Sequence, residues 1–253
     1  MDMQTNIIYN ENCLETLKRM NDDSIDCVIT SPPYNMNLRI RNGKYCSRQI
    51  IKELSTKYID FNDNMPIDEY YKLHSNILKE LLRVSKIIFY NIQIVTGSKR
   101  SVFKMIGEFS DQLKDIIIWD KINAQPSMQK NVINRKSELI LVFDSKNAIS
   151  RMYDIANFNR GEMDDIWKIK RGKKIDKNHS ATFPVELVEK IILNFTLENQ
   201  IIYDPFMGLG TTALCCIKKN RKYIGSELSK EYVDISKKRL KEHRSQLRMF
   251  YNA

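Results

Sequence analysis

The chain has 253 residues, 42% of them hydrophobic, so it is long enough for a single α/β domain with a substantial core. Its 41 basic residues outnumber the 31 acidic ones, and the formal net charge of +10 makes a polyanion the expected partner. The chain has five cysteines without a C-x-x-C pair and three scattered histidines, which argues against a disulfide framework and a metal site. It has no apolar run of the roughly 18 residues that a membrane span needs. A cytoplasmic protein is therefore expected.

The first predicted elements lead into an abrupt loop. Residues 6–9 predict a short strand, residues 13–20 predict a helix from their apolar spacing, and residues 25–30 predict a buried strand. This last strand stops at Ser31, because the two prolines that follow cannot donate hydrogen bonds to a sheet.

The loop after this strand reads Ser31-Pro32-Pro33-Tyr34. Two fixed φ angles make it rigid, and it presents the Ser31 hydroxyl and backbone carbonyls as acceptors. The flat ring of Tyr34 beside them is expected to offer an open face for stacking. Such a loop fits a planar amine, for example the exocyclic amino group of a base. The alternative is that the prolines only end a strand.

A basic stretch over residues 36–65 follows with little periodicity. It is predicted to be an insertion, and it is either a solvated surface or a loop that grips DNA phosphates. The candidate contacts in it are Arg39, Arg41 and Lys44.

Helices and strands then alternate. A helix is predicted from Pro66, a strand over 86–90 and a helix over 99–112. Strands over 115–119 and 137–143 complete the series. This alternation predicts a sheet covered by helices on both faces.

Hydrophobic periodicity is weak again over residues 144–178, a segment predicted to recognise a DNA sequence. Its basic candidates for DNA contact are Arg171, Lys173 and Lys174. A helix with an apolar face is predicted to begin at Pro184.

A glycine-rich loop follows the next predicted strand, residues 200–203. Gly208 and Gly210 belong to a G-x-G-x-x-G/A motif that follows a predicted strand and precedes a predicted helix. Glu227 ends the next predicted strand, where a ribose-binding acid is expected. A basic helix is predicted from Lys230. A dinucleotide enzyme would fit this loop equally well, but only some forty residues follow Gly210, too few for the second nucleotide-binding half.

The order of these motifs resembles that of the beta-class DNA amino-methyltransferases. In that family a Ser-Pro-Pro-Tyr loop comes first, a recognition region follows, and the cofactor loop comes last. The segments that carry the resemblance are residues 30–35, 179–187 and 204–212. The resemblance implies one domain over residues 1–253 with small recognition insertions, folded as a permuted, doubly wound, Rossmann-like α/β sheet of about seven strands.

The resemblance also implies an activity and a site. S-adenosylmethionine would give its methyl group to cytosine N4 or adenine N6 of a base flipped out of double-stranded DNA. In the family the first residue of this loop is Ser more often in cytosine-N4 enzymes and Asp more often in adenine-N6 enzymes, so Ser31 favours cytosine slightly. The implied catalytic residues are Ser31, Pro32, Pro33 and Tyr34. The implied cofactor-binding residues are Asn12, Thr182, Asp204, Phe206, Gly208, Gly210, Thr211 and Glu227. This reading requires the proline loop and the glycine loop, far apart in the sequence, to lie side by side.

The chain departs from the family pattern at two further positions. Asn12 replaces the usual acidic residue near the adenine of the cofactor, and Ser137 stands where relatives often carry an aromatic that touches the flipped base. These departures leave open a DNA-binding protein of the same fold without catalysis. The resemblance likewise leaves open a homodimer and a cognate restriction endonuclease as partners.

Overall fold

The computed structural model describes most of the chain, namely residues 3–36, 38–41, 44–47, 63–124, 130–172 and 183–251. Three predicted site residues, Thr182, Lys173 and Lys174, lie outside this set. For Arg39 and Arg41 the described part is the backbone alone.

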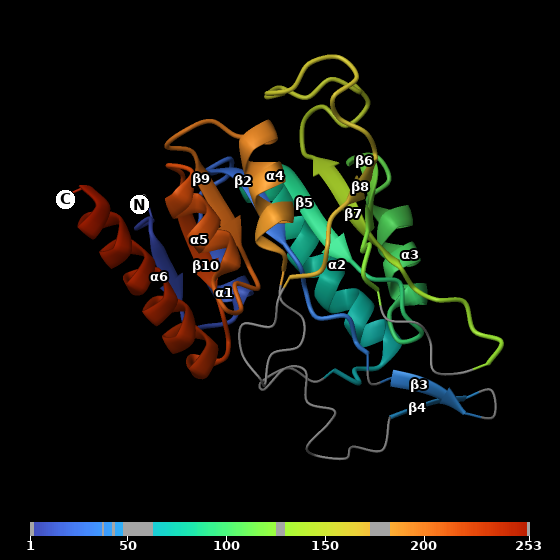
Figure 1. Cartoon of the computed structure of the whole chain (residues 1–253). Helices are drawn as coiled ribbons and strands as arrows, with labels where there is room; N and C mark the ends of the chain where they lie inside the picture. Colours follow the sequence, from blue (N-terminus) through green and yellow to red (C-terminus); the bar gives the residue numbers. More distant parts are fainter. Residues whose placement is uncertain are drawn as a thin grey trace.

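One eight-stranded sheet runs through the molecule (Figure 1). Its neighbouring strands pair in parallel except at β7, which is antiparallel to both of its neighbours. In spatial order the strands are β1 (Ile7–Tyr9), β10 (Lys222–Ser226), β9 (Ile201–Asp204), β2 (Ile25–Thr30), β5 (Ser85–Ile92), β7 (Ser137–Asp144), β6 (Leu113–Asp120) and β8 (Ile166–Lys168).

Helices cover both faces of this sheet, as the alternation in the sequence predicts. They are α1 (Cys13–Lys18), α2 (Ile67–Val84), α3 (Lys99–Glu108), α4 (Val185–Phe195), α5 (Thr211–Lys218) and α6 (Lys230–Tyr251). Along β2, Cys27 and Ile29 face a core cluster built with α4, α5 and α6, whereas Val28 faces a second cluster built with α1, α2 and α3. The doubly wound α/β fold is therefore confirmed.

The strands in the middle of the sheet are apolar because both of their faces are buried. Ile29, Phe89 and Val142 on one face are completely buried, as are Val28 and Leu141 on the other. At about 25 cal/mol for each Å² of apolar surface removed from water, this burial supplies the main stabilisation of the fold.

The two segments predicted to be irregular insertions contain regular structure. Within residues 36–65, β3 (Leu38–Arg41) and β4 (Lys44–Ser47) form an antiparallel hairpin that lies apart from the main sheet (Figure 1). Within residues 144–178, β8 pairs with β6 and adds an eighth strand to the expected seven. The signal for β8 in the sequence is weak, because only Trp167 of its three residues is buried.

The described residues contain neither a candidate membrane span nor a candidate metal cluster. No described helix combines the length and the apolar character needed to cross a bilayer. Within the same residues, no group of three or more histidine, cysteine, aspartate or glutamate side chains is arranged to hold a metal ion.

Candidate active site

The two loops singled out by the sequence leave the same edge of the sheet. The Ser31 loop follows β2 and the glycine loop follows β9, and these strands are parallel neighbours although 174 residues separate Thr30 from Asp204. The Thr30 hydroxyl donates a hydrogen bond of 2.9 Å to Asp204 Oδ1. The prediction that both loops lie side by side is confirmed.

Asp204 holds this junction together. Its Oδ1 accepts the bond from Thr30 and another of 3.0 Å from the backbone N–H of Phe206, and its Oδ2 accepts one of 2.6 Å from Thr212. Burial raises the pKa of Asp204 to about 6, against the lowering effect of these three hydrogen bonds. The carboxyl group thus joins β2, the glycine loop and α5.

The glycine loop needs its glycines for two reasons. Gly208 and Gly210 have φ angles of 52° and 76°, in the left-handed region that favours glycine. A Cβ on Gly210 would also lie 2.8 Å from the Cβ of Ser236, so the loop packs tightly against α6. The start of α5 is fixed by this close approach.

Glu227 follows β10 and closes the other side of the loop. Its two oxygens accept hydrogen bonds from the backbone N–H groups of Gly208 at 2.8 Å and Ser229 at 2.9 Å. A carboxylate can accept about four hydrogen bonds. A ribose hydroxyl is a suitable further donor to Glu227, and the site fits a cofactor that contains a nucleoside.

The other described cofactor candidates surround this loop. Phe206 is half-buried against the α1–α3 cluster. Thr211 is buried at the start of α5 and accepts a hydrogen bond of 3.2 Å from Arg239. Asn12 is exposed, and its side chain caps α1 by accepting a bond of 2.9 Å from the N–H of Leu14.

The hydroxyls of the Ser31 loop belong to a polar network that sequence reasoning missed. Ser31 Oγ and Tyr34 Oη are 2.8 Å apart, and Tyr34 donates a hydrogen bond of 2.7 Å to Glu138 Oε2. Asn91 Nδ2 lies 3.2 Å from Ser31 Oγ and 2.7 Å from both Tyr34 Oη and Glu138 Oε2. Lys121 Nζ bonds the other oxygen, Glu138 Oε1, at 2.9 Å.

Sheet order explains why these residues meet. Ser31 follows β2, Asn91 lies near the end of β5, Glu138 lies at the start of the antiparallel β7, and Lys121 follows β6. Because these four strands are consecutive in the sheet, their ends at this edge form a row. The only signal in the sequence was a polar residue at each strand end.

Hydrogen bonds to other segments hold the Ser31 loop in place. The Tyr70 hydroxyl of α2 donates a hydrogen bond of 2.7 Å to the carbonyl of Pro33. The Asn35 side chain donates to the carbonyls of Met65 at 2.8 Å and Gly97 at 3.0 Å. These bonds add to the stiffness that the prolines impose.

The expectation of an open Tyr34 ring face needs correction for this structure. Tyr34 is only 6% exposed and packs within the α1–α3 cluster. Its hydroxyl, which contacts Ser31, is therefore the part of the side chain that reaches the candidate site.

Of the basic residues predicted to contact DNA, two have described side chains, Lys44 and Arg171. Lys44 begins β4 of the hairpin and is exposed. Arg171 is exposed in the segment after β8, where its backbone N–H donates a bond of 3.0 Å to Asn123 Oδ1. Since β8 is parallel to β6, this segment leaves the sheet at the edge that carries Ser31.

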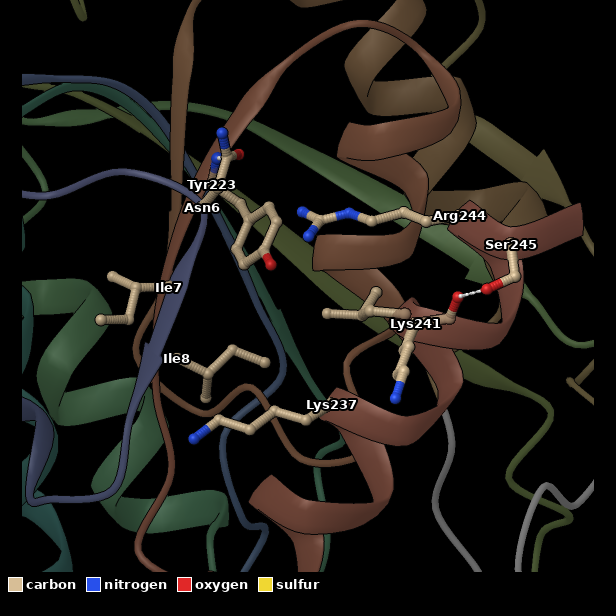
Figure 2. A pocket seen from close by; sticks show the side chains of 9 residues that line it. Asn6, Ile7, Ile8, Tyr223, Lys237, Lys241, Arg244 and Ser245 are labelled. Carbon is tan, nitrogen blue, oxygen red and sulfur yellow. Dashed lines mark hydrogen bonds between the residues drawn. The ribbon is translucent and has the colours of Figure 1, made fainter. Parts of the chain in front are cut away.

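A cavity of about 370 Å³ lies between β1, at one end of the strand order, and α6 (Figure 2). Lys237, Lys241 and Arg244 line it from the helix, and Tyr223 lines it from the beginning of β10. Because Tyr223 lies at the opposite end of β10 from Glu227, we do not assign this cavity to the reaction.

The sheet is doubly wound, and it carries a glycine loop and a proline loop at adjacent strand ends. These features place the protein in the class of Rossmann-like enzymes with a nucleoside-containing cofactor. The particular family follows from sequence comparison. The N6/N4 type DNA methylase family model matches residues 25–238, so the chain belongs to that family. It is an S-adenosylmethionine-dependent DNA methyltransferase, and its substrate is DNA.

Individual relatives agree with this assignment. The Type II methyltransferase M2.MboI of Moraxella bovis is 28% identical over 93% of this chain and 87% of the relative. Among solved structures, the cytosine-N4-specific PvuII DNA methyltransferase has a TM-score of 0.69 at 18% identity and covers 92% of this chain and 86% of that one. The M1.HpyAVI complex with S-adenosylmethionine has a TM-score of 0.66 at 24% identity, with coverage of 92% and 98%.

Proposed function

We propose that the enzyme methylates the N4 atom of cytosine at a specific DNA sequence, with Ser31, Pro32, Pro33 and Tyr34 as its catalytic loop. The observation that carries the reaction is the position of the Ser31 hydroxyl, whereas the preference for cytosine comes from the resemblance of the Ser-Pro-Pro-Tyr loop. This hydroxyl lies on a rigid loop whose strand is bonded directly to the strand before the glycine loop.

The role of this loop follows from the chemistry of the substrate. A base amino group is a poor nucleophile, because its lone pair is delocalised into the ring. Hydrogen bonds from its two protons to Ser31 Oγ and the carbonyl of Pro32 would localise that pair toward the incoming methyl group. The amino nitrogen would bond the methyl carbon as the bond from that carbon to the sulfonium sulfur breaks. The sulfur would keep the electron pair of that bond, and the nitrogen would lose one proton.

S-adenosylmethionine supplies an electrophilic methyl group on a sulfonium centre. Glu227 would bind its ribose, Phe206 would pack beside its adenosine, and Gly208 and Gly210 would let the backbone approach it closely. Asp204 acts on this site by fixing the loops, since both of its oxygens already accept bonds from the chain. Asn12, Thr182 and Thr211 complete the proposed cofactor-binding set.

The target amino group cannot be reached inside a duplex, so the base would be flipped out at a cost of a few kcal/mol. Stacking on Tyr34 would offset part of that cost only if the loop exposes more of the ring than its present 6%. The basic segments within 36–65 and 144–178 are the proposed DNA-contacting insertions.

Two features of the partners also belong to the proposal. The Type II designation of relatives supports a cognate restriction endonuclease of the same sequence specificity. A homodimer is the proposed oligomeric state, which light scattering of the purified chain would test directly.

Adenine N6 is the second candidate target, since a hydroxyl accepts an amino proton from either base. Mass spectrometry of nucleosides from DNA treated with enzyme and cofactor distinguishes the two. N4-methylcytosine is the expected product. N6-methyladenine as the sole product would overturn the choice of base while leaving the reaction type intact.

A further inference from the structure

Glu138 has a place in the candidate site that the proposed mechanism does not use. It is 7% exposed, and it forms an ion pair of 2.9 Å with Lys121, which is 2% exposed. A buried ion pair contributes little net stability compared with apolar packing, so stability alone does not explain it. Its second oxygen contacts Tyr34 and Asn91.

The charge of Glu138 fixes the direction of the hydrogen bonds around it. An ionised carboxylate only accepts, so Tyr34 and Asn91 both act as donors to Oε2. Tyr34 has one hydroxyl proton, and that proton is committed to Glu138. In the 2.8 Å contact between Ser31 and Tyr34, Ser31 is then the donor.

We infer that Glu138, held by Lys121, is a positioning residue that makes Ser31 a hydrogen-bond acceptor toward the target base. The Ser31 proton points to Tyr34, so Ser31 Oγ acts only as an acceptor toward its other neighbours. One of its lone pairs faces Asn91 at 3.2 Å, and the other can accept from an amino group. Asn91 supports the same arrangement, because its amide is closer to Tyr34 Oη and Glu138 Oε2, at 2.7 Å, than to Ser31 Oγ, at 3.2 Å. This inference rests on the proposed role of Ser31 as an acceptor.

Glu138→Gln tests the inference with almost no change of shape. Lys121 only donates, so the carbonyl of the new side chain would face Lys121 and its NH₂ group would face Tyr34. Tyr34 would then accept a hydrogen bond from this amide and donate one to Ser31. The direction of the hydrogen bonds from residue 138 to Ser31 is thereby reversed, and a lone pair of Ser31 Oγ becomes occupied. We expect kcat to fall about 10- to 100-fold, with the Kd for S-adenosylmethionine within twofold of wild type.

The matched control is Asp144→Asn. Asp144 of β7 pairs with Lys114 of β6 at 3.2 Å, and the two side chains are buried to a similar degree as Glu138 and Lys121. This pair lies at the opposite end of β7 from Glu138, away from Ser31. Asp144→Asn is therefore expected to lower stability and leave kcat unchanged.

Tyr34→Phe provides a second variant that keeps the Glu138–Lys121 pair. It removes the hydroxyl that links Glu138 to Ser31, so adding Glu138→Gln should cost little more than Tyr34→Phe alone. If the two losses of kcat multiply, or if Glu138→Gln turns over like wild type, the inference is overturned. A wild-type enzyme that transfers no methyl group would instead contradict the proposed function.

Discussion

Asp204 carries the clearest pH dependence of any single residue in the site. Its pKa is raised from 3.8 to about 6 by burial, so between these values the folded protein binds a proton more readily than the unfolded chain. The contribution of Asp204 to stability is therefore fully present below about pH 4 and is lost as the pH rises through about 6.

We predict that Asp204→Asn removes this contribution. Asn keeps an acceptor for Thr30 and Phe206, while Thr212 can turn its hydroxyl to accept from the new amide. The difference in unfolding free energy between pH 4 and 7 should change by about 3 kcal/mol, from a pKa shift of about two units.

Urea denaturation across this pH range measures the effect. Asp144→Asn is the control of opposite sign, because hydrogen bonds to Lys146, Asn147 and Lys114 outweigh burial and lower the pKa of Asp144. An unchanged pH profile for Asp204→Asn would mean that the carboxyl group is ionised throughout.

Residue-scale prediction from the sequence succeeded where a motif is local. Ser31, Pro32, Pro33 and Tyr34 are contiguous, and a rigid loop after an apolar strand can be read from them alone. Lys121 and Glu138 could not be found in this way. They join the network of Tyr34 and Asn91 beside Ser31 only because β5, β7 and β6 follow β2 in the sheet, and no local pattern encodes that order.

At the scale of elements, the packing of the glycine loop against α6 sets the shape of the proposed cofactor site. Gly210→Ala would add a Cβ 2.8 Å from the Cβ of Ser236 while forcing alanine to a φ of 76°. We predict a loss of about 2 to 4 kcal/mol in stability and weaker binding of S-adenosylmethionine, measured by denaturation and calorimetry.

Two other glycines separate the effect of contact with α6 from that of backbone strain. Gly161 has a φ of 83° with open space around it, so Gly161→Ala should cost only about 1 to 2 kcal/mol of backbone strain. Gly107 in α3 is open, and Gly107→Ala should stabilise by about 0.5 to 1 kcal/mol. Equal effects at Gly210 and Gly161 would show that contact with α6 is unimportant.

The long strands and amphipathic helices were predictable because their burial patterns repeat over many residues. The short elements were not. The three-residue strand β8 and the β3–β4 hairpin are too short to produce a clear period, and β8 is fixed by contacts such as the 2.7 Å bond from Trp119 Nε1 to the carbonyl of Ile169.

For the whole molecule, the net charge of +10 should make DNA binding depend on salt. Replacing Arg39, Arg41 and Lys44 together with alanine should lower DNA affinity. If each contacts one phosphate, the slope of log K against log salt should fall by about 2 to 3. Fluorescence anisotropy of a labelled duplex over a salt series measures this slope.

A charge-matched control lies on α6. Lys237, Lys241 and Arg244 are exposed beside the cavity of Figure 2, away from Ser31, and their replacement by alanine should leave the slope nearly unchanged. If instead this set alone lowers the slope, DNA binds across α6 and the proposed insertions do not grip it.

At the same scale, the Ser31 loop should perform methyl transfer beside the cofactor loop. The most direct measurement is transfer of label from methyl-labelled S-adenosylmethionine to double-stranded DNA, comparing wild type with Ser31→Ala. Wild type should label the DNA, and Ser31→Ala should lose about 100-fold or more of that rate with cofactor affinity within twofold. DNA that wild type binds but does not label, or an equal rate for Ser31→Ala, would contradict this mechanism.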